Sequence, residues 1–238
     1  MKIALIGYGK MGKVIEKIAL DRGHEIVLKI SSRNPGDFNR EHSRAADVAI
    51  EFSHPGAALE NVRKCLEFGL PVVCGTTGWL EQRETVEDYC REQQGRFLYA
   101  SNFSIGVNIF FELNERLARL MNKYPEYEVD VEEIHHTQKL DRPSGTALTL
   151  TEQIVDNLDR KTGWTMDPSQ RQDLIPLRAI REDEVPGTHQ VRYRSETDSI
   201  EIIHTAHNRN GFASGAVLAA EFLFRAGPGS YSMRDVLL

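Results

Sequence analysis

The stretch Lys2-Ile3-Ala4-Leu5-Ile6-Gly7-Tyr8-Gly9-Lys10-Met11-Gly12 decides the fold of the first part of the chain. It begins with a short apolar run that favours a β-strand, and this run stops at a turn of the form Gly-x-Gly-x-x-Gly. Apolar residues then recur at helical spacing until Gly23. The stretch therefore predicts a strand, a tight glycine turn and a helix, in that order.

The next 80 or so residues alternate between β-favouring and helical segments. We expect strands at Glu25 to Ile30, Asp47 to Phe52, Pro71 to Cys74 and Arg96 to Ala100, with helices at Pro55 to Phe68 and Leu80 to Gln93. Strands that alternate with helices are typical of a parallel, doubly wound sheet. Residues 1–103 are therefore predicted to form an α/β, Rossmann-like domain.

The pattern changes after residue 103. We expect a long amphipathic helix from Ser104 to about Tyr124, because Ile109, Leu113, Leu117 and Leu120 share one face. Strands gathered without alternating helices then predict an α+β domain over residues 104–208. Its other expected elements are a strand at Glu128 to His135, a helix from about Thr146 to Leu158, a Pro- and Gly-containing stretch around Thr162 to Pro176, and a hairpin of His189 to Glu196 and Ser199 to Ala206 that turns at Thr197-Asp198. A last helix, about Gly215 to Phe224, could pack on either domain.

Composition excludes several classes of protein. The chain has 238 residues, 40% hydrophobic and 27% charged, which is ordinary for globular domains. A net charge of −6 indicates no surface for nucleic acid. No apolar run approaches the roughly 18 residues of a membrane-spanning helix, and Gly7 interrupts the first run before a secretory signal could form. We expect a cytoplasmic protein with reduced, non-catalytic cysteines and with no nucleic-acid or membrane partner.

The glycine turn is a candidate dinucleotide site. Gly7 permits the tight turn, Gly9 lets a pyrophosphate approach the backbone, and Gly12 lets the helix pack closely on the strand. The phosphates would lie at the helix N-terminus, where free N–H groups and the helix dipole favour an anion. The alternative is that the glycines form only a structural turn. The position of the turn between the first strand and the first helix favours a dinucleotide-binding site.

The end of the second expected strand bears on which dinucleotide is bound. NAD sites usually carry an acidic residue there, about 20 residues past the glycines, to hold the ribose 2′-hydroxyl. This chain has Ser31-Ser32-Arg33 instead. Ser31 would not repel a 2′-phosphate, and Arg33 could pair with it, so NADPH is favoured over NADH. The alternative is that Arg33 is an exposed loop residue without a ligand.

The densest group of chemically active side chains lies between Glu132 and Ala147. Because His135 and His136 are neighbours at the end of an extended strand, their side chains point in opposite directions, and we expect no metal site. The turn Ser144-Gly145-Thr146 opens a helix, so its N–H groups and hydroxyls could bind an anion beside a histidine. The alternative is a structural strand end with solvated charges.

The segment His135-His136-x-x-Lys139-x-Asp141-x-Pro143-Ser144-Gly145-Thr146-Ala147 resembles the signature of the bacterial dihydrodipicolinate reductase family. These enzymes, also called 4-hydroxy-tetrahydrodipicolinate reductases, belong to lysine and diaminopimelate biosynthesis. Three more segments resemble the family in the same order: Gly75-Thr76-Thr77-Gly78 its nicotinamide-contacting turn, Ala100 to Asn108 its interdomain segment, and Arg209 to Ala216 its C-terminal return to the nucleotide domain. The glycine turn is one residue shorter than in the family, and Ser31 replaces the family's acidic residue.

The resemblance implies NAD(P)H-dependent reduction of 4-hydroxy-tetrahydrodipicolinate, a cyclic imine dicarboxylate, to tetrahydrodipicolinate. Hydride addition leaves an enamine that must be protonated, and the resemblance implies His135 as this acid and Lys139 as a proton donor or charge stabiliser at the ring nitrogen. Substrate would be bound by His136, Ser144, Gly145, Thr146 and Thr77. The cofactor would be bound by Gly7, Tyr8, Gly9, Lys10, Met11, Gly12, Ser31, Arg33, Gly75, Thr76, Thr77, Ser101, Asn102, Phe103, Arg209 and Phe212.

The resemblance also implies a homotetramer built through the sheet of the second domain. It assigns residues 209–238 to the dinucleotide-binding domain, and it implies a hinge around Ser101 to Ser104 and Ala206 to Arg209. Residues 104–208 would then bind substrate and form the oligomer. Metal is not expected among the cofactors.

Two other functions remain open from the residues alone. A semialdehyde or amino-acid dehydrogenase could have the same two-domain plan, although Cys74 and Cys90 lack the setting of an activated thiol. A non-catalytic NADPH-binding sensor could have kept the nucleotide domain. Such a sensor would not need an acid at His135, a lysine at Lys139 or an anion pocket at Ser144-Gly145-Thr146.

Overall fold

The computed structural model describes residues 1–167, 171–208 and 210–238. The chain divides into two compact units, one formed by 1–105 with 210–238 and the other by 106–209. The domain boundaries expected from the sequence, after residues 103 and 208, lie close to these divisions.

Within the described residues, the first unit contains a sheet of six strands in the order β11-β5-β4-β3-β1-β2. All neighbouring strands run parallel. The predicted doubly wound parallel sheet is therefore confirmed. The strands are β1 (Lys2–Ile6), β2 (Glu25–Ile30), β3 (Val48–Glu51), β4 (Val72–Cys74), β5 (Arg96–Tyr99) and β11 (Gly229–Tyr231).

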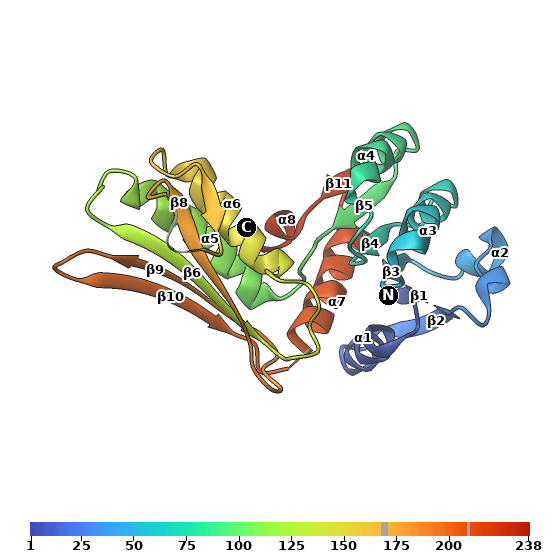
Figure 1. Cartoon of the computed structure of the whole chain (residues 1–238). Helices are drawn as coiled ribbons and strands as arrows, with labels where there is room; N and C mark the ends of the chain where they lie inside the picture. Colours follow the sequence, from blue (N-terminus) through green and yellow to red (C-terminus); the bar gives the residue numbers. More distant parts are fainter. Residues whose placement is uncertain (168–170, 209) are drawn as a thin grey trace. The chain divides into compact units, whose positions relative to one another are not determined.

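Helices cover both faces of this sheet (Figure 1). Alternate residues of a strand point to opposite faces. Ile3 and Leu5 of β1 pack with α1 and α7, and Ala4 and Ile6 pack on the α3 and α4 side. Burial on both faces explains the unbroken apolar run that opens the chain. The helices are α1 (Lys10–Asp21), α2 (Arg40–Ser43), α3 (Pro55–Glu67), α4 (Arg83–Glu92), α7 (Asn210–Arg225) and α8 (Met233–Leu237).

The C-terminal segment belongs to the first unit. Helix α7 begins at Asn210, earlier than expected, and packs against α1. Strand β11 then adds to the edge of the sheet beside β5. It was not expected, because a three-residue strand that begins with Gly229-Ser230 has no alternating pattern to reveal it.

The second unit contains a mixed sheet in the order β10-β9-β6-β8-β7. Helices α5 (Ile105–Met121) and α6 (Gly145–Asn157) pack on one of its faces (Figure 1). The predicted α+β character is confirmed, and β9 and β10 form the expected hairpin. The strands are β6 (Glu128–His135), β7 (Gly163–Thr165), β8 (Leu174–Arg181), β9 (Thr188–Arg194) and β10 (Ser199–Thr205).

Strand β8 was not predicted from the sequence. The Pro- and Gly-containing stretch of Thr162 to Pro176 ends inside β8, which runs parallel to β6 in the interior of the sheet. The strand was missed because Pro176 interrupts its apolar run, and proline within such a run argues against a central strand. In the structure Pro176 lies where β8 pairs with the three-residue β7.

The buried face of α5 is also different from the expected one. Ile109, Leu113 and Leu120 are half or more exposed, at 51%, 50% and 59%. Leu117 is partly buried against the core. The helix instead buries Val107, Phe110, Asn114, Ala118 and Met121. Two apolar stripes lie on this helix, and periodicity alone does not say which one faces the sheet.

Gly215 offers a test of the packing of α7. A Cβ at this position would lie 1.7 Å from the backbone oxygen of Phe103, so the helix and this segment touch through backbone. Replacing glycine by alanine inside a helix ordinarily stabilises it by about 1 kcal/mol. Here we expect Gly215→Ala to lower the free energy of unfolding by about 2 kcal/mol or more, because the overlap forces backbone apart.

Gly211→Ala in the same helix is the matched control. Its Cβ would lie at an ordinary 3.6 Å from Ser104 Oγ, so stability should stay the same or rise. Chemical denaturation of both variants measures the difference. Equal stability of the two would contradict the close approach at Gly215.

Candidate active site

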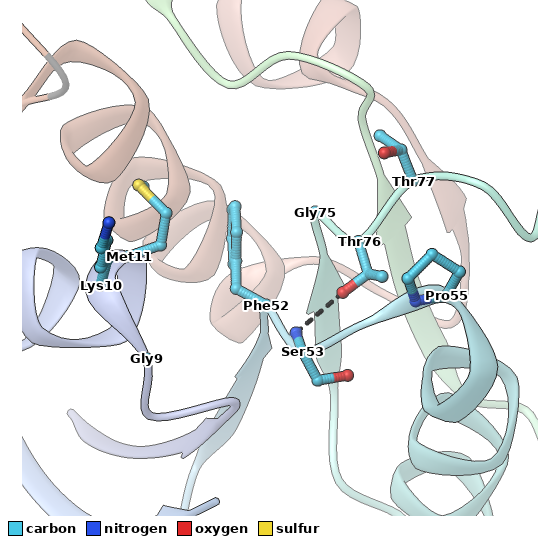
Figure 2. A pocket seen from close by; sticks show the side chains of 9 residues that line it. All are labelled: Gly9, Lys10, Met11, Phe52, Ser53, Pro55, Gly75, Thr76 and Thr77. Atoms are coloured by element: carbon cyan, nitrogen blue, oxygen red, sulfur yellow. Dashed lines mark hydrogen bonds between the residues drawn. The ribbon is translucent and has the colours of Figure 1, made fainter. Parts of the chain in front are cut away.

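The first unit has a pocket of about 340 Å³ at the carboxyl ends of β1, β3 and β4 (Figure 2). The strand order reverses between β1 and β3, and ligands of doubly wound sheets bind at such a reversal. The pocket is lined by Gly9, Lys10, Met11, Phe52, Ser53, Pro55, Gly75, Thr76 and Thr77.

The glycine turn has the geometry of a phosphate-binding loop. A Cβ on Gly7 would lie 2.0 Å from Phe52 O, and one on Gly12 would lie 2.4 Å from Gly7 O, so both glycines are needed for close packing. Gly9 has open space where a side chain would be. It precedes α1, whose first turn carries Lys10 and no carboxylate. This turn fits the pyrophosphate of a dinucleotide.

The opposite wall of the pocket comes from β3 and β4. Ser53 N donates a hydrogen bond to Thr76 Oγ1 at 2.9 Å, which joins the two strand ends (Figure 2). Gly75 lies against the ring of Phe52, and Thr77 is exposed. Phe52, Ser53 and Pro55 were not among the expected residues. Their signal was available, because the end of the third strand lies next to the reversal in strand order.

A buried carboxylate lies beneath this wall. Glu51, at the end of β3, is fully buried. Its oxygens accept hydrogen bonds from Ser53 N at 3.2 Å, from the Ser53 hydroxyl and from Cys74 Sγ at 3.2 Å. Glu51 therefore holds the ends of β3 and β4 in the positions that shape the pocket.

The loop after β2 contains the two residues expected to select the cofactor. The Ser31 hydroxyl donates to Asn34 Oδ1 at 2.9 Å, and the Arg33 amide donates to Ser31 Oγ at 3.3 Å. Asn34 in turn donates to Asp37 at 2.9 Å. The loop is thus ordered by its own hydrogen bonds, and the side chain of Arg33 is exposed to solvent.

Tyr8 and the remaining expected cofactor residues vary in exposure. Tyr8 donates to Glu16, which pairs with Lys29 at 2.5 Å. Ser101 is exposed, and Asn102 is buried. Phe103 is 2% exposed and packs on Phe52, so its side chain belongs to the core rather than to a ligand surface. Phe212 is half-buried in the first turn of α7, and Arg209 lies outside the described residues.

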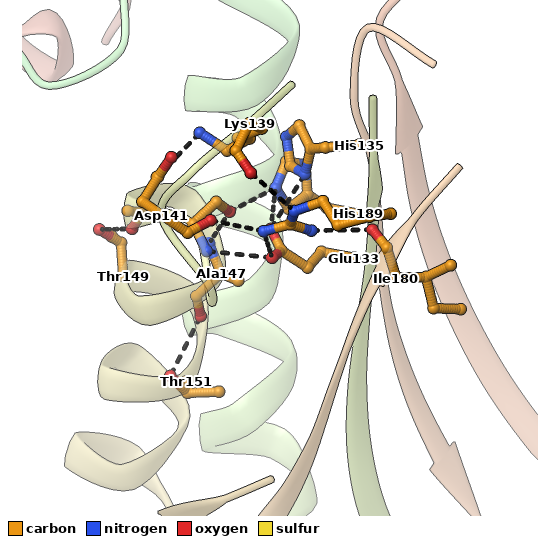
Figure 3. A network of polar contacts seen from close by, with 12 residues as sticks. Glu133, His135, Lys139, Asp141, Ala147, Thr149, Thr151, Ile180 and His189 are labelled. Atoms are coloured by element: carbon orange, nitrogen blue, oxygen red, sulfur yellow. Dashed lines mark hydrogen bonds and ion pairs between the residues drawn. The ribbon is translucent and has the colours of Figure 1, made fainter. Parts of the chain in front are cut away.

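The second unit contains a separate polar cluster, at the end of β6 (Figure 3). Side chains alternate along this strand, so Glu133 and His135 share its buried face with valines. In the register of the sheet, Glu133 lies opposite His189 of β9, and His135 lies beside Arg181 of β8. Ser144 precedes α6 and caps it, because its Oγ accepts from Ala147 N at 3.2 Å.

Glu133 is the centre of the cluster. Its Oε1 accepts from Ser144 N at 3.0 Å and from Arg181 Nη2 at 3.1 Å, and its Oε2 lies 3.1 Å from His135 Nδ1. Burial raises the pKa of this carboxyl, but His135, Ser144 and Arg181 outweigh burial and lower the pKa to about 2. Glu133 is therefore ionised at neutral pH.

His189 is neutral at the same pH. Burial, together with the nearby His135, lowers its pKa to about 3. Its Nε2 lies 3.2 Å from Ser144 Oγ, and its ring stands roughly perpendicular to that of His135, with centroids 5.0 Å apart. His189 thus contributes hydrogen bonding and packing, but no charge, to the cluster.

Lys139 and His136 lie beside this centre. Lys139 Nζ donates to Asp141 at 2.8 Å. Burial raises the pKa of Asp141, but the hydrogen bond from Lys139 outweighs burial and lowers it. Arg181 also donates to the backbone oxygens of Lys139 and Asp141, so one side chain ties this loop to Glu133. His136 is half-buried and held by its amide, which donates to Val185 O at 2.8 Å.

The helix N-terminus is only partly open. Ser144 is 2% exposed, and its N–H and Oγ are engaged with Glu133, Ala147 and His189. Gly145 is exposed with open space at its Cβ position, and Thr146 is half-buried in the first turn. An anion at this helix would therefore meet Gly145 and Thr146, with Ser144 fixing the turn from below.

A combination of possible metal ligands also occurs here. Glu133, His135 and His189 each place a ligand atom within 4.8 Å of the others. His136 is not part of this group, as the opposite directions of neighbouring strand residues predict. Arg181 already neutralises Glu133, and Ser144 lies against His189. This geometry fits a hydrogen-bonded network better than a cation site.

Sequence reasoning missed three residues of the cluster. Glu133 could have been found, because it lies two residues before His135 and therefore on the same face of the strand. Arg181 and His189 could not have been found in this way. They reach the cluster only through the pairing of β6 with β8 and β9, and β8 was not expected.

Models of one protein family match both units of the chain. Residues 1–103 match the family model described as dihydrodipicolinate reductase, N-terminus, and residues 106–237 match the model described as dihydrodipicolinate reductase, C-terminus. The chain belongs to this family. The reductase is thus an oxidoreductase that uses NAD(P)H, and its pocket at the glycine turn fits that cofactor.

Related proteins extend over the whole chain. The 4-hydroxy-tetrahydrodipicolinate reductase of Christiangramia forsetii is 50% identical and covers 100% of this chain and 98% of its own. The protein of the same name from Methanopyrus kandleri is 40% identical and covers 82% of this chain and 72% of its own. Among the described residues of this reductase, no helix is long and apolar enough to cross a membrane.

Solved structures show the same fold. A dipicolinate-bound dihydrodipicolinate reductase from Paenisporosarcina sp. TG-14 has a TM-score of 0.79 at 23% identity and covers 100% of this chain and 99% of its own. An aspartate semialdehyde dehydrogenase II from Vibrio cholerae has a TM-score of 0.53 at 12% identity and covers 94% of this chain and 98% of its own. The second match reflects a shared two-domain plan.

Proposed function

We propose that this protein catalyses the NAD(P)H-dependent reduction of 4-hydroxy-tetrahydrodipicolinate to tetrahydrodipicolinate in lysine and diaminopimelate biosynthesis. The observation that carries the proposal is the cluster in the second unit. It combines a histidine, a lysine and an open helix N-terminus, the groups needed to protonate and to hold a dicarboxylate, in a chain of the dihydrodipicolinate reductase family.

The first unit would hold the cofactor. Gly9 leaves space for its pyrophosphate, and the turn Gly75-Thr76-Thr77 forms the wall that the nicotinamide would contact. When bound, the reduced nicotinamide supplies a hydride for C4 of the substrate. Thr77, which is exposed at the rim of this wall, is proposed to contact the substrate.

The second unit would bind the substrate and supply the proton. His135 protonates the enamine left by hydride addition. Lys139 stabilises charge at the ring nitrogen or donates a proton there. Gly145 and Thr146 receive one carboxylate at the N-terminus of α6, Ser144 fixes this turn, and His136 contacts the substrate from the end of β6.

The rival functions lack support in the site. A dehydrogenase that forms a thioester needs an ionisable, accessible thiol, whereas Cys65, Cys74 and Cys90 are buried and burial raises the pKa of each thiol. A sensor that only binds NADPH has no use for Lys139 and His135 beside an open helix N-terminus.

We expect His135→Gln to lower kcat by about 10²-fold or more with little change in cofactor affinity, since general acid catalysis is typically worth 10² to 10⁴. Lys139→Ala should lower kcat and also raise KM for the substrate, because a cation facing a dianion contributes to both. Nicotinamide absorbance with enzymatically generated substrate measures these effects. Lys123→Ala, an exposed lysine of the same unit, is the control. Weaker cofactor binding with normal turnover in His135→Gln would contradict the assignment.

NADPH is proposed as the preferred form of the cofactor. The loop after β2 offers Ser31 and the exposed Arg33 where an acidic residue would repel a 2′-phosphate. A charge-assisted contact of Arg33 with this phosphate is worth about 1.5–3 kcal/mol, or roughly ten- to a hundredfold in affinity. Lys10 in the glycine turn would add to the positive potential.

We therefore expect kcat/KM to favour NADPH over NADH by at least about tenfold. Arg33→Ala should remove most of this preference, and Ser31→Asp should reverse it by repulsion. Arg44→Ala, which removes an exposed arginine elsewhere in the unit, should leave it unchanged. Steady-state kinetics with both cofactors provides the comparison. Equal use of both by the unmodified protein would place cofactor recognition elsewhere.

A homotetramer formed through the second sheet is proposed as well. Helices α5 and α6 pack on one face of this sheet. Ile203, on the edge strand β10, lies on the other face and is 57% exposed. The same face carries ion pairs such as Arg178–Glu132. We expect light scattering to give four chain masses, and Ile203→Asp to yield smaller species, because the charge would be buried unpaired. A monomeric unmodified protein would contradict this proposal.

A further inference from the structure

We propose that Glu133 is a positioning residue that keeps the proton of neutral His135 on Nδ1, so that Nε2 is the atom that exchanges the proton with substrate. The same carboxylate would fix the N-terminus of α6 relative to this imidazole. The assignment of Nε2 as the transferring atom rests on the proposed function. The position of the proton on the imidazole does not.

His135 and Glu133 bring two buried atoms close together. His135 Nδ1 lies 3.1 Å from Glu133 Oε2. Both atoms are buried, and neither has a hydrogen-bond partner in the part of the chain that the structure describes. A buried polar atom without a partner is costly, and a small rotation of the imidazole that turns Nδ1–H toward Oε2 would satisfy both atoms.

Glu133 carries a negative charge. Its Oε1 receives two donors, the amide of Ser144 and the guanidinium of Arg181. A carboxylate surrounded by donors is ionised and can only accept hydrogen bonds. The low pKa of this group agrees with that state. Nδ1 of His135 must therefore carry the hydrogen, which leaves Nε2 as the position that gains or loses a proton.

His189 does not compete for a hydrogen bond to the same oxygen. Its Nε2 lies 3.7 Å from Glu133 Oε2, beyond hydrogen-bond distance, and 3.2 Å from Ser144 Oγ. The charged and titratable groups around His135 are thus Glu133 on its own strand, Arg181 from β8, His189 from β9 and Lys139 from the following loop. His204 of β10 lies next to His189 and acts on its pKa.

Gly187 lies against the Nε2 side of the ring. A Cβ on Gly187 would lie 2.9 Å from His135 Nε2 and 3.2 Å from its Cδ2. Any other residue here would press on the atom that is proposed to transfer the proton. The backbone of Gly187 also has a positive φ of +154°, which other residues rarely adopt. Glycine is therefore the residue that lets this turn pack against the Nε2 edge of the ring without displacing it.

The same carboxylate links the acid to the anion-binding turn. Glu133 contacts His135 through one oxygen and the Ser144 amide through the other. One rigid side chain of β6 thus sets the position of the imidazole against that of the α6 N-terminus. A substrate held by its carboxylate at Gly145 and Thr146 would then meet the acid at a fixed distance, which is a requirement for efficient proton transfer.

The decisive experiment is 15N NMR of the unmodified protein labelled at histidine, with His135→Gln used to assign the resonance. We expect neutral His135 to show a protonated Nδ1 and an unprotonated Nε2. The opposite tautomer would overturn the proposal. Because this readout needs no substrate, it stands even if the protein proves to have no reductase activity, an outcome that would count against the proposed function alone.

Kinetics of Glu133→Gln provides the second test. The amide has the same shape but offers an NH₂ group to Nδ1, which favours the wrong tautomer. We expect kcat to fall by about 10²-fold or more while KM for the substrate stays within about threefold. The 15N spectrum of Glu133→Gln should also show the proton of neutral His135 on Nε2, because an NH₂ group that faces Nδ1 cannot accept a hydrogen bond from it.

Two further variants separate positioning from general stability. Glu152→Gln alters an exposed carboxylate of the same unit, on α6, and should change neither kcat nor the tautomer of His135. Glu133→Asp keeps the charge and should keep the proton of neutral His135 on Nδ1 even if kcat recovers only in part. If Glu133→Gln keeps full kcat and a protonated Nδ1, or if its kcat falls no further than that of Glu152→Gln, Glu133 does not position the acid.

Discussion

The need to satisfy a buried carboxylate underlies both sites of this protein. Transfer of an ionised carboxylate from water into the interior costs several kcal/mol unless donors surround it. Glu51 and Glu133 are both fully buried, each near the carboxyl end of a strand. Each therefore fixes the position of the groups around it, and those groups form the walls of the two candidate sites.

The two carboxylates are stabilised by different partners. Glu51 is surrounded by neutral donors, the Ser53 amide and hydroxyl and the Cys74 thiol, at the strand ends that border the pocket. Glu133 lies among a guanidinium, an imidazole and a helix N-terminus, so its surroundings carry charge. This difference suits the two ligands. A dinucleotide is recognised along an extended backbone surface, whereas proton transfer needs a charged group beside the acid.

The local signals in the sequence were sufficient for the first unit. The unbroken apolar run before Gly7 and the alternation that follows it predict a sheet buried on both faces, and the residues at its switch point follow from that topology. Only elements without a local signal were missed there, such as β11, which exists because β5 has a free edge to pair with.

The second unit was less predictable, because its site depends on strand pairing. His135, Lys139 and the Ser144 turn are close in sequence and could be found together. Arg181 and His189 lie 46 and 54 residues beyond His135 and join it only through β8 and β9. The choice between the two apolar stripes of α5 also depends on the sheet, since only the shape of the opposite surface selects Phe110 over Ile109.

The two candidate sites differ in how they respond to amino-acid substitutions. At the pocket of the first unit the course of the backbone is fixed by Gly7, Gly12 and Glu51, so an exposed loop residue such as Arg33 can vary without disturbing the fold. At the acid cluster Glu133 accepts from Ser144 and Arg181 and pairs with His135, so the loss of any one of these partners leaves a buried charge less well compensated. Cofactor preference can therefore change by single substitutions, whereas the arrangement around His135 can change only if several residues change together.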